Sequence, residues 1–497
     1  MTDVVLGVDI GTSSSKGVLV SLDGALLATA TRHHDVQRPR RGHVEMDARI
    51  WWQEFVAIHI ELRAAVASVD VDVVAVGVSG MGPCTLLTDD AGEPLRPAIL
   101  YGVDTRAGDQ IARLTERYTA TAVVERCGSA ITSQAVGPKI AWVADHEPGV
   151  FASARRLFMP SSYVVWQLTG EYVLDHHSAS QSVPLYDARA NAWHAPWWDD
   201  IAGHIEPPRL AWSDDVAGTV STAAAEATGL PEGIPVITGT IDAWAEAISV
   251  DAHNPGDLML MYGTTMFLIS TVAAPVSAPP LWGPVGAYAG TRSLAAGMAT
   301  SGAITSWLKE LFGSDYADLV AAADASGPGA GGLLMLPYFA GERTPVEDPD
   351  ARGIIAGLTV SHTAGDVYRA ALEATAMGVR HNIEAFVAAG APIDRVVAVG
   401  GGVQGDLWTQ IVSNITGLRQ ELRTHSIGAS LGSAFVAARA VASPTFDDWN
   451  PVAGEVVPQP ELAAAYDRLY GLYRDLYSST LNVSHALADI QSTRNHR

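Results

Sequence analysis

The sequence is poor in cysteine and in basic residues. It contains 2 cysteines, Cys84 and Cys127, in 497 residues, which excludes a disulfide framework and favours a reducing compartment. Lys and Arg number 31 against 54 Asp and Glu, so the formal net charge is −23. A chain this acidic lacks the basic surface through which proteins bind nucleic acids or anionic membranes. Any polyanionic ligand must therefore be held by local hydrogen-bond donors, dipoles or a metal ion.

Long apolar runs and a targeting segment are also missing. No apolar stretch reaches the length of a membrane span, and no basic segment followed by an apolar one opens the chain. We therefore expect a cytoplasmic protein that binds neither nucleic acid nor membrane. The composition, with 48% hydrophobic residues, is that of a globular enzyme. Because 497 residues are too many for one ordinary core, we expect two large domains.

The first 20 residues predict a β-hairpin with a hydroxyl-rich tip. A buried-type strand, residues 4–8, runs into Asp9, and a small polar turn, residues 11–15, leads to a second strand, residues 17–20. Small residues let backbone N–H groups approach an anion closely, and hydroxyl groups add donors. This composition suits a phosphate-holding turn, although the Walker pattern is absent. Two alternatives stay open here: an ordinary Ser-rich hairpin, and a Lys16 that is solvated instead of reaching a phosphate.

The same pattern returns about half a chain later. In residues 256–270, an apolar strand, a Gly263-Thr264-Thr265 turn and a second apolar strand follow one another, and this turn matches Gly11-Thr12-Ser13. Two such hairpins at equivalent places indicate two related domains that face one ligand. Asp242 follows a strand and precedes a small-residue helix, where it is either a functional acid or a helix N-cap.

Two strand ends in the first half carry further candidate residues. The Val-rich run 71–78, typical of a strand buried on both faces, is followed by Met81 and Gly82. Asp104 and Arg106 follow another strand end, where they suit a polar-ligand site. The equally weighted alternative is a solvated helix start with Asp104 as its N-cap.

A stretch rich in His and Trp, residues 175–215, raises the question of a metal site. Asp175, His176 and His177 are adjacent, but no second cluster at ligand spacing completes the set. We therefore expect these three residues in a loop that covers the substrate.

A glycine turn near residue 400 allows a different function. Gly400, Gly402 and Gly405 follow a strand and precede a helix, and Glu421 lies near the acidic position of the dinucleotide fingerprint. An NAD-dependent oxidoreductase is therefore an alternative. The turn lies far from the start of either half, however, and this alternative leaves both Gly-Thr hairpins unexplained. A glycine turn also lets an adenosine lie flat on the backbone.

Together these motifs resemble the FGGY family of carbohydrate kinases, in the actin-like ATPase superfamily, and most closely its xylulokinase-like branch. The resemblance spans nearly the whole chain. It implies an α/β fold of two actin-like (ribonuclease H-like) domains, residues 1–245 and 246–497, with mixed central sheets flanked by helices and a ligand cleft between them. The segments that carry it are Asp9-Ile10-Gly11-Thr12-Ser13, Gly239-Thr240-Ile241-Asp242-Ala243, Tyr262-Gly263-Thr264-Thr265, residues 337–345, residues 353–373 and Gly400-Gly401-Gly402.

The resemblance implies ATP-dependent phosphorylation of a sugar hydroxyl, on a pentulose such as D-xylulose or a related ketose or polyol. ATP and Mg²⁺ would be required, and a homodimer is compatible with the family. The N-terminal domain would hold the sugar and the base, and the C-terminal domain most of the ATP site. The implied residues are Asp242 as general base; Asp9 for Mg²⁺; Gly11, Thr12, Ser13, Lys16, Gly263, Thr264, Thr265, Gly302, Gly401, Gly402 and Asp406 for the nucleotide; and Met81, Gly82, Asp104 and Arg106, with Asp242, for the sugar.

Two departures from the family pattern affect the substrate. Xylulokinases typically show Gln-Met-His-Gly, whereas this chain has Gly80-Met81-Gly82-Pro83 and so lacks the imidazole that would contact the sugar. The segment 101–106 also differs from Trp-Asn-Asp-Gly-Arg. Xylulose therefore becomes one candidate among pentuloses and polyols. A third alternative, an actin-like ATPase without a sugar substrate, is disfavoured by Asp242, an acid that the resemblance places beneath the phosphate turns.

Overall fold

The computed structural model describes residues 2–494, which divide into two compact units. Unit 1 runs to Pro255 and adds Thr271–Ser293 and Ile427–Pro451. Unit 2 comprises Gly256–Ser270, Leu294–Ser426 and the chain from Val452. The predicted boundary between residues 245 and 246 falls inside helix α10 (Asp242–Ser249).

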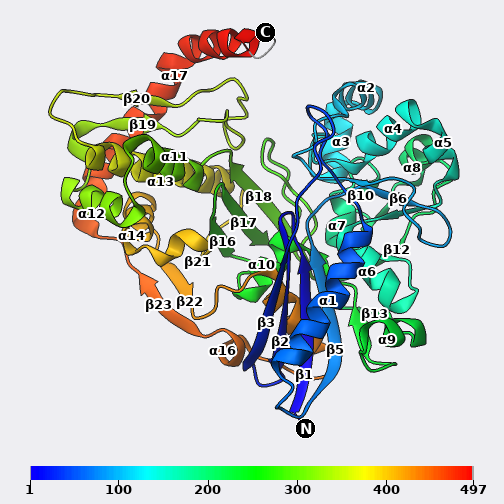
Figure 1. The fold of residues 1–497 in the computed structure, drawn as a ribbon. Coiled ribbons are helices and arrows are strands. Elements are labelled where there is room, and N and C mark those ends of the chain that lie inside the picture. Colours follow the sequence, from blue (N-terminus) through cyan, green and yellow to red (C-terminus); the bar gives the residue numbers. More distant parts are fainter. Residues whose placement is uncertain (1, 495–497) are drawn as a thin grey trace. The chain divides into compact units, whose positions relative to one another are not determined.

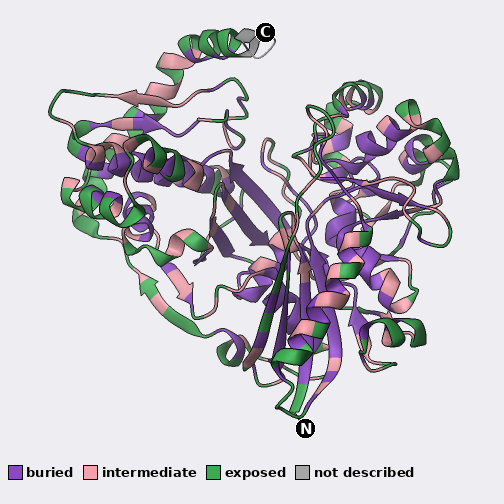
Figure 2. Ribbon diagram, viewed as in Figure 1, coloured by how far each residue is buried: buried purple, intermediate pink, exposed green. Residues whose placement is uncertain are grey.

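Unit 1 is built on a 7-stranded mixed sheet (Figure 1). Its strands are β1 (Thr2–Ile10), β2 (Ser14–Ser21), β3 (Leu26–His33), β5 (Val71–Gly80), β13 (Val216–Thr219), β14 (Pro235–Ile237) and β15 (Thr240–Ile241). The order is β13-β14-β5-β1-β2-β3, and β15 also pairs with β5. Strand β1 is antiparallel to β2 and parallel to β5. Figure 2 shows these three strands buried along most of their length, which explains their near-continuous apolar sequences.

Helices cover both faces of this sheet. The helices of unit 1 are α1 (Arg49–Ala65), α2 (Gly108–Tyr118), α3 (Ala120–Cys127), α4 (Val136–His146), α5 (Pro148–Ser153), α6 (Pro160–Thr169), α7 (His176–Ser180), α8 (Ala195–Ile201), α9 (Thr222–Thr228), α10, α15 (Ala429–Arg439) and α16 (Phe446–Trp449). Gly17 on β2 lies against Ile58 of α1, whereas Gly7 on β1 lies against Ser430 of α15. Since Gly17 pairs with Val8, and adjacent residues of a strand point to opposite faces, α1 and α15 lie on opposite faces.

Short strand pairs complete unit 1. They are β4 (Glu45–Met46) with β7 (Ala98–Ile99), β6 (Leu86–Thr88) with β8 (Arg156–Phe158), β9 (Val173–Asp175) with β12 (Arg209–Ala211), and β10 (Tyr186–Asp187) with β11 (Ala192–Trp193).

Unit 2 repeats the central arrangement of unit 1 on a 6-stranded sheet, in the order β18-β17-β16-β21-β22-β23. These strands are β16 (Asp257–Tyr262), β17 (Met266–Val272), β18 (Arg292–Met298), β21 (Arg395–Val399), β22 (Gln420–Arg423) and β23 (Val452–Val456), and β19 (Leu334–Leu336) pairs separately with β20 (Ile354–Ala356). Strand β16 is antiparallel to β17 and parallel to β21, as β1 is to β2 and β5. The predicted duplicate hairpin and the mixed sheets are thereby confirmed.

The helices of unit 2 include the longest ones in the described chain. They are α11 (Gly302–Phe312), α12 (Tyr316–Ser326), α13 (Ala364–Ala388), α14 (Asp406–Thr416) and α17 (Ala463–Arg494), with short 3-10 turns η1 (Ala330–Gly332), η2 (Gly401–Gln404) and η3 (Pro460–Leu462). Thr363 caps α13 in a capping box, because its hydroxyl accepts from the N–H of Asp366 and the Asp366 carboxylate accepts from the N–H of Thr363. Trp408 of α14 donates to the Thr375 hydroxyl of α13 at 3.0 Å, which joins these helices.

The prediction of a loop at residues 175–177 is wrong. Asp175 ends β9, and both histidines lie in the short helix α7. The Asp175 carboxylate caps this helix by accepting from the N–H of Ser178, and it also accepts from the Thr240 hydroxyl at 2.9 Å. His177 is buried and hydrogen-bonded to the carbonyl of Val285 at 2.6 Å. These polar residues are structural parts of unit 1.

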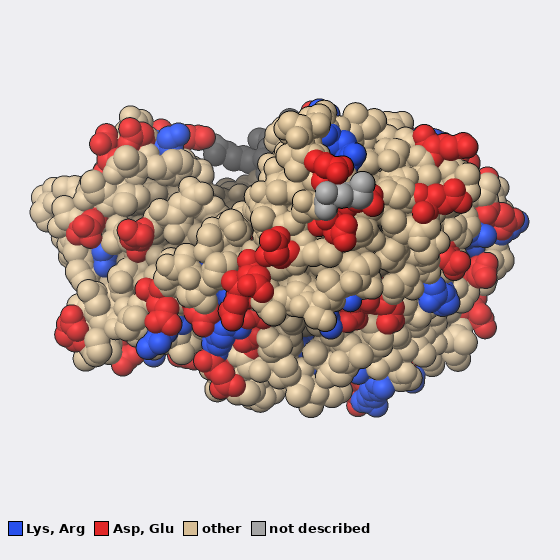
Figure 3. Space-filling view, turned by 90° about the horizontal axis from the view of Figure 1, so that it is seen from below, with Lys and Arg blue, Asp and Glu red and all other residues tan. Residues whose placement is uncertain are grey.

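On the face shown in Figure 3, acidic side chains are spread among uncharged ones, and the described Lys and Arg side chains form no continuous patch. Among the described residues, no helix has both the length and the apolar character needed to cross a membrane.

Close backbone packing holds α10 against α15, and this packing can be tested. A Cβ atom added at Gly432 would lie 1.9 Å from the carbonyl oxygen of Ala245. We expect Gly432→Ala to lower the free energy of unfolding by about 1–3 kcal/mol, because the two helices must separate.

A matched control is available at another helical glycine. A Cβ atom at Gly471 in α17 would meet nothing within 4 Å, so Gly471→Ala should be neutral or stabilise by up to about 1 kcal/mol. Urea unfolding of both variants provides the comparison. Equal effects of the two substitutions would show that the loss of stability in Gly432→Ala does not come from forcing α10 and α15 apart.

Candidate active site

The carboxyl ends of three neighbouring strands bring the two predicted acids together. Across the first hairpin, Asp9 pairs with Lys16, and on the other side it pairs with Ser79 of β5. The Ser79 hydroxyl donates to Asp9 Oδ1 at 2.8 Å. Strand β15 continues this edge, because Ile241 pairs with β5 one residue after Ser79. Asp242 follows directly and therefore emerges at the same edge as Asp9.

A glycine turn directs Asp242 into this position. Gly239 has φ +74°, and a Cβ atom there would lie 1.9 Å from the carbonyl oxygen of Val78. Only glycine fits such a left-handed, tightly packed position. Asp242 is the first residue of α10, while Ile241 occupies the N-cap position. The Asp242 Oδ1 atom accepts from the N–H of Ala243 at 2.7 Å, so the N-cap alternative for Asp242 is wrong.

A third acid, which the sequence analysis did not select, joins the pair. Glu246 lies one helical turn beyond Asp242 on α10, and residues four apart share a helix face. Its carboxylate lies at the start of α15, since a Cβ atom at Gly428 would be 2.9 Å from Glu246 Oε2, and the helix dipole there favours negative charge. The sequence does contain a signal for Glu246, because it lies four residues after Asp242 in a predicted helix.

Burial raises the pKa of all three acids, and the charge of Asp9 adds to this shift at Asp242 and Glu246. Burial raises the pKa of Asp9 above its ordinary value, although Ser79 and Lys16 act in the opposite direction. Burial, followed by the negative charge of Asp9, raises the pKa of Asp242. The same two causes raise the pKa of Glu246 to about 7. Acids with such raised pKa values are typical of catalytic sites and cation sites.

The tip of the first hairpin is compact and partly accessible. The N–H of Gly11 donates to the carbonyl of Ser14 at 3.1 Å, which closes the turn. The Thr12 hydroxyl lies 2.9 Å from the phenol oxygen of Tyr101, while Ser13 and Lys16 are exposed. The Tyr101 hydroxyl thus connects the predicted phosphate turn to the segment that carries Asp104. This link was missed because it joins residues 89 positions apart.

In unit 2, the second Gly-Thr turn is bonded to the start of α11. The N–H of Gly302 donates to the carbonyl of Gly263 at 3.0 Å, and the N–H of Ser301 donates to the carbonyl of Thr264 at 3.1 Å. Thr264 is exposed, and Thr265 is partly buried. The structure therefore brings together Gly263, Thr264 and Gly302, which the resemblance assigned to the nucleotide.

The glycine turn after β21 lies beside the same strand of unit 2. A Cβ atom at Gly402 would lie 2.8 Å from the side chains of both Tyr262 and Trp408. Gly401 is exposed and would meet nothing within 4 Å, and Asp406, the first residue of α14, is exposed as well. Since Gly263 follows Tyr262 directly, this turn and the Gly-Thr turn occupy one end of the sheet.

Two of the predicted sugar residues lie next to the acids. The N–H of Met81 donates to the carbonyl of Ile10 at 2.8 Å, immediately after Asp9 in β1. A Cβ atom at Gly82 would lie 2.7 Å from the side chain of Ile241, the residue that precedes Asp242. Met81 and Gly82 are thus packed between the two strands that end in the acids.

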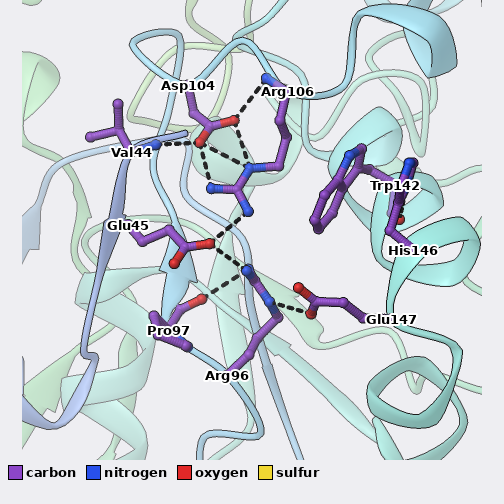
Figure 4. Close-up of polar contacts among 9 residues, drawn as sticks. All are labelled: Val44, Glu45, Arg96, Pro97, Asp104, Arg106, Trp142, His146 and Glu147. Atoms are coloured by element: carbon purple, nitrogen blue, oxygen red, sulfur yellow. Dashed lines mark hydrogen bonds and ion pairs between the residues drawn. The ribbon is translucent and has the colours of Figure 1, made fainter. Parts of the chain in front are cut away.

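The other two predicted sugar residues, Asp104 and Arg106, bind each other in a buried ion-pair network (Figure 4). Arg106 Nη2 lies 2.7 Å from Asp104 Oδ2, and both side chains have 0% exposure. Asp104 Oδ2 also accepts from the N–H of Val44 at 2.6 Å. Arg106 Nη1 donates to Glu45 Oε1 at 2.6 Å. Because α2 begins only at Gly108, the N-cap alternative for Asp104 is wrong.

The network extends through a second arginine. Arg96 donates to Glu45 at 2.5 Å and to Glu147 at 2.7 Å, and the guanidinium of Arg106 lies 4.9 Å from the ring centroid of Trp142. Asp104 and Arg106 therefore fix the segment around residues 101–106 in place. Direct contact of either residue with a sugar stays a prediction.

Comparison with protein families decides the identity of this arrangement. Residues 4–249 match the N-terminal domain, and residues 258–441 the C-terminal domain, of the FGGY family of carbohydrate kinases. The chain belongs to this family. It is a carbohydrate kinase that uses ATP to phosphorylate a sugar hydroxyl, as predicted. The family also accounts for both Gly-Thr hairpins, which the dinucleotide-binding alternative left unexplained.

Known relatives of this FGGY kinase cover nearly its full length. It is 27% identical over 507 residues to xylulose kinase of Bacillus subtilis, covering 97% of this chain and 98% of that protein. It is 29% identical over 461 residues to glycerol kinase of Delftia acidovorans, covering 87% and 89%. The crystal structure of xylulose kinase from Rhodospirillum rubrum matches with a TM-score of 0.91 and 32% identity, covering 97% of this chain and 100% of that one.

Removal of one acid from the cluster should stabilise the kinase at high pH. The pKa of Glu246 is raised from 4.5 to about 7, so its contribution to stability is complete below 4.5 and is lost as the pH rises through about 7. We expect Glu246→Gln to raise Tm by about 2–4 °C at pH 8 and to change it little at pH 5. Thermal unfolding in EDTA measures both, with exposed Glu116→Gln as the control. A lower Tm of Glu246→Gln than of the wild type at pH 8 would contradict the repulsion between Glu246 and Asp9.

The buried ion pair should contribute far more than an exposed one. Asp104→Asn removes one of the two carboxylates that pair with the buried Arg106, so we expect a loss of about 3–5 kcal/mol in the free energy of unfolding. Glu61→Gln breaks the Arg32–Glu61 pair, whose side chains are each 43% exposed, and should cost at most about 1 kcal/mol. Comparable losses in urea unfolding would refute the structural role of the network.

Proposed function

We propose that this FGGY kinase transfers the γ-phosphoryl group of ATP to a hydroxyl of a pentulose, with D-xylulose as the first substrate to test. The observation that carries this proposal is the position of Asp242 beside Asp9, which follows from the pairing of β1, β5 and β15. The similarity to xylulose kinases along almost the full chain supports the choice of pentulose.

Asp242 is the proposed general base. One of its carboxylate oxygens takes the proton from the sugar hydroxyl. As this proton leaves, the sugar oxygen attacks the γ-phosphorus, and the bond between the γ-phosphorus and the ADP oxygen breaks. The raised pKa of Asp242 makes the carboxylate a better proton acceptor near neutral pH. The position of Met81 and Gly82 against Ile10 and Ile241 supports a sugar site next to this carboxylate.

The acids also suit a magnesium ion, for which we propose Asp9 as the protein ligand. Among residues 2–494, no three His, Cys, Asp or Glu side chains are grouped as a metal site. Mg²⁺ bound with nucleotides typically needs only one or two carboxylates, because waters and phosphates complete its coordination. The three neighbouring acids provide the negative charge that a divalent cation neutralises. When bound, Mg²⁺ neutralises charge on the β- and γ-phosphates.

The nucleotide assignments remain proposals from the family resemblance. In unit 1, the tip of the first hairpin would hold phosphates with Gly11, Thr12, Ser13 and Lys16. The remaining nucleotide residues lie in unit 2, and they are Gly263, Thr264, Thr265, Gly302, Gly401, Gly402 and Asp406. Asp104 and Arg106 would shape the sugar site. A homodimer and a cytoplasmic location are the matching proposals for assembly and compartment.

Asp242→Asn tests the proposed base. We expect kcat to fall by about 10²–10⁴-fold with a smaller change in KM, because the amide still fills the position but cannot accept the proton. A coupled assay of ADP release with D-xylulose, other pentuloses and polyols including glycerol measures this. The exposed Asp109→Asn should match the wild type.

The panel of acceptors separates the alternatives. ATP turnover that is indifferent to every acceptor would contradict the sugar kinase proposal and favour an ATPase. Undiminished phosphorylation by Asp242→Asn would remove Asp242 from catalysis. A polyol that is clearly preferred over all pentuloses would replace xylulose while leaving the kinase assignment intact.

A further inference from the structure

A histidine outside the family motifs supports the phosphate turn, residues 11–15. His34 follows β3 directly, and its backbone N–H donates to the carbonyl of Ser13 at 3.1 Å. Its ring atom Nε2 lies 3.1 Å from the carbonyl oxygen of Gly11. Its other ring nitrogen, Nδ1, lies 2.9 Å from Glu54 Oε2 on α1. One residue thus contacts two carbonyl groups of the turn and a carboxylate behind it.

The partners of the ring determine its protonation. A carbonyl oxygen and a carboxylate only accept hydrogen bonds, so both ring nitrogens face acceptors. A neutral imidazole has one N–H and would place a lone pair against one of these oxygens. Only the imidazolium donates to both. The side chains of His34 and Glu54 are 6% and 14% exposed, so water has little access to replace either bond.

The charges around His34 agree with this protonation. Hydrogen bonding to Glu54 is the largest effect and raises the pKa of His34, as do the charge of Glu54 and the carbonyl groups of Gly11 and Thr12, while burial opposes them. Glu54 on α1 is the titratable group that acts on His34, and the turn contributes only backbone carbonyls. His33, the neighbouring residue on β3, is exposed.

We propose that His34, held as an imidazolium by Glu54, is a positioning residue for the ATP phosphates. By binding the carbonyl of Gly11, the ring keeps that oxygen directed away from the turn's anion-binding side, so the N–H and hydroxyl groups of Thr12 and Ser13 remain available to phosphate. It also adds a positive charge beneath a turn in a chain of net charge −23. This inference rests on the proposed role of the turn in ATP binding.

The proposal gives ATP binding a defined pH dependence. Because the folded-state pKa of His34 is raised, the pair with Glu54 is complete at a pH below 6.5 and is lost as the pH rises through the raised value. The neutral imidazole then has a single N–H, so it loses its hydrogen bond either to the Gly11 carbonyl or to the Glu54 carboxylate. The KM for ATP of the wild type should therefore rise with pH across this range, and the KM for the sugar should not.

Three variants of the full chain test the proposal kinetically. We expect His34→Gln to raise the KM for ATP about tenfold, as loss of a charge-assisted hydrogen bond predicts, with a smaller change in kcat and no pH dependence of that KM. Glu54→Gln keeps an acceptor but removes its charge, so the rise in KM should begin at a lower pH. His33→Gln should match the wild type. Thermal unfolding confirms that each variant is folded.

A spectroscopic measurement on the protein without nucleotide tests the protonation separately. In ¹H–¹⁵N spectra of the imidazole nitrogens, His34 should carry hydrogens on both nitrogens at pH 6.5, and Glu54→Gln should lower its pKa. A neutral His34 at pH 6.5 would overturn the inference. So would an active kinase in which His34→Gln keeps the wild-type KM for ATP at every pH. Absence of any ATP turnover by the wild type would instead contradict the proposed function.

Discussion

The structure of unit 1 depends on the parallel pairing of β1 with β5, and of β5 with β15. This register places the residue after Ile10, the residues after Gly80 and the residue after Ile241 at one edge of the sheet. The acids Asp9 and Asp242 are more than 200 residues apart in sequence, yet they are separated in space by a single strand. Once the register is set, no loop is needed to bring them together, so the proposed base and the proposed magnesium ligand both lie on regular secondary structure.

The cluster of buried acids at this edge lowers the stability of the folded chain. Burial raises the pKa of Asp9, Asp242 and Glu246, and the negative charge of Asp9 raises the pKa of Asp242 and Glu246 further. The repulsion persists because α10 cannot move away: Gly432 lets α15 contact its backbone directly, and the Gly239 turn fixes its start. The proposed Mg²⁺ ion, and the proton that the proposed base takes from the substrate, would both relieve the same repulsion.

Around this rigid edge, the substrate segments are held by different forces. The segment with Asp104 and Arg106 is fixed by buried ion pairs, whose partners Glu45 and Arg96 come from separate short strands and loops. The turn that is proposed to hold phosphate, residues 11–15, contacts the His34 ring through the Gly11 carbonyl and the Tyr101 hydroxyl through Thr12. In a chain with 31 basic and 54 acidic residues, the basic side chains Arg96 and Arg106 are thus buried in ion pairs that fix the backbone.

The sequence by itself determined the secondary structure around the site, the duplicated hairpin and the family. Apolar strands, Gly-Thr turns and the capping box at Thr363 are local patterns, and local patterns are readable without the fold. Only the tertiary structure decided which polar residues meet. It showed that Asp104 and Arg106 neutralise each other, that Glu246 joins the acids, and that His34 reaches Gly11 and Glu54. These contacts depend on strand register and helix packing, which join residues far apart in the chain and so cannot be read from local sequence patterns.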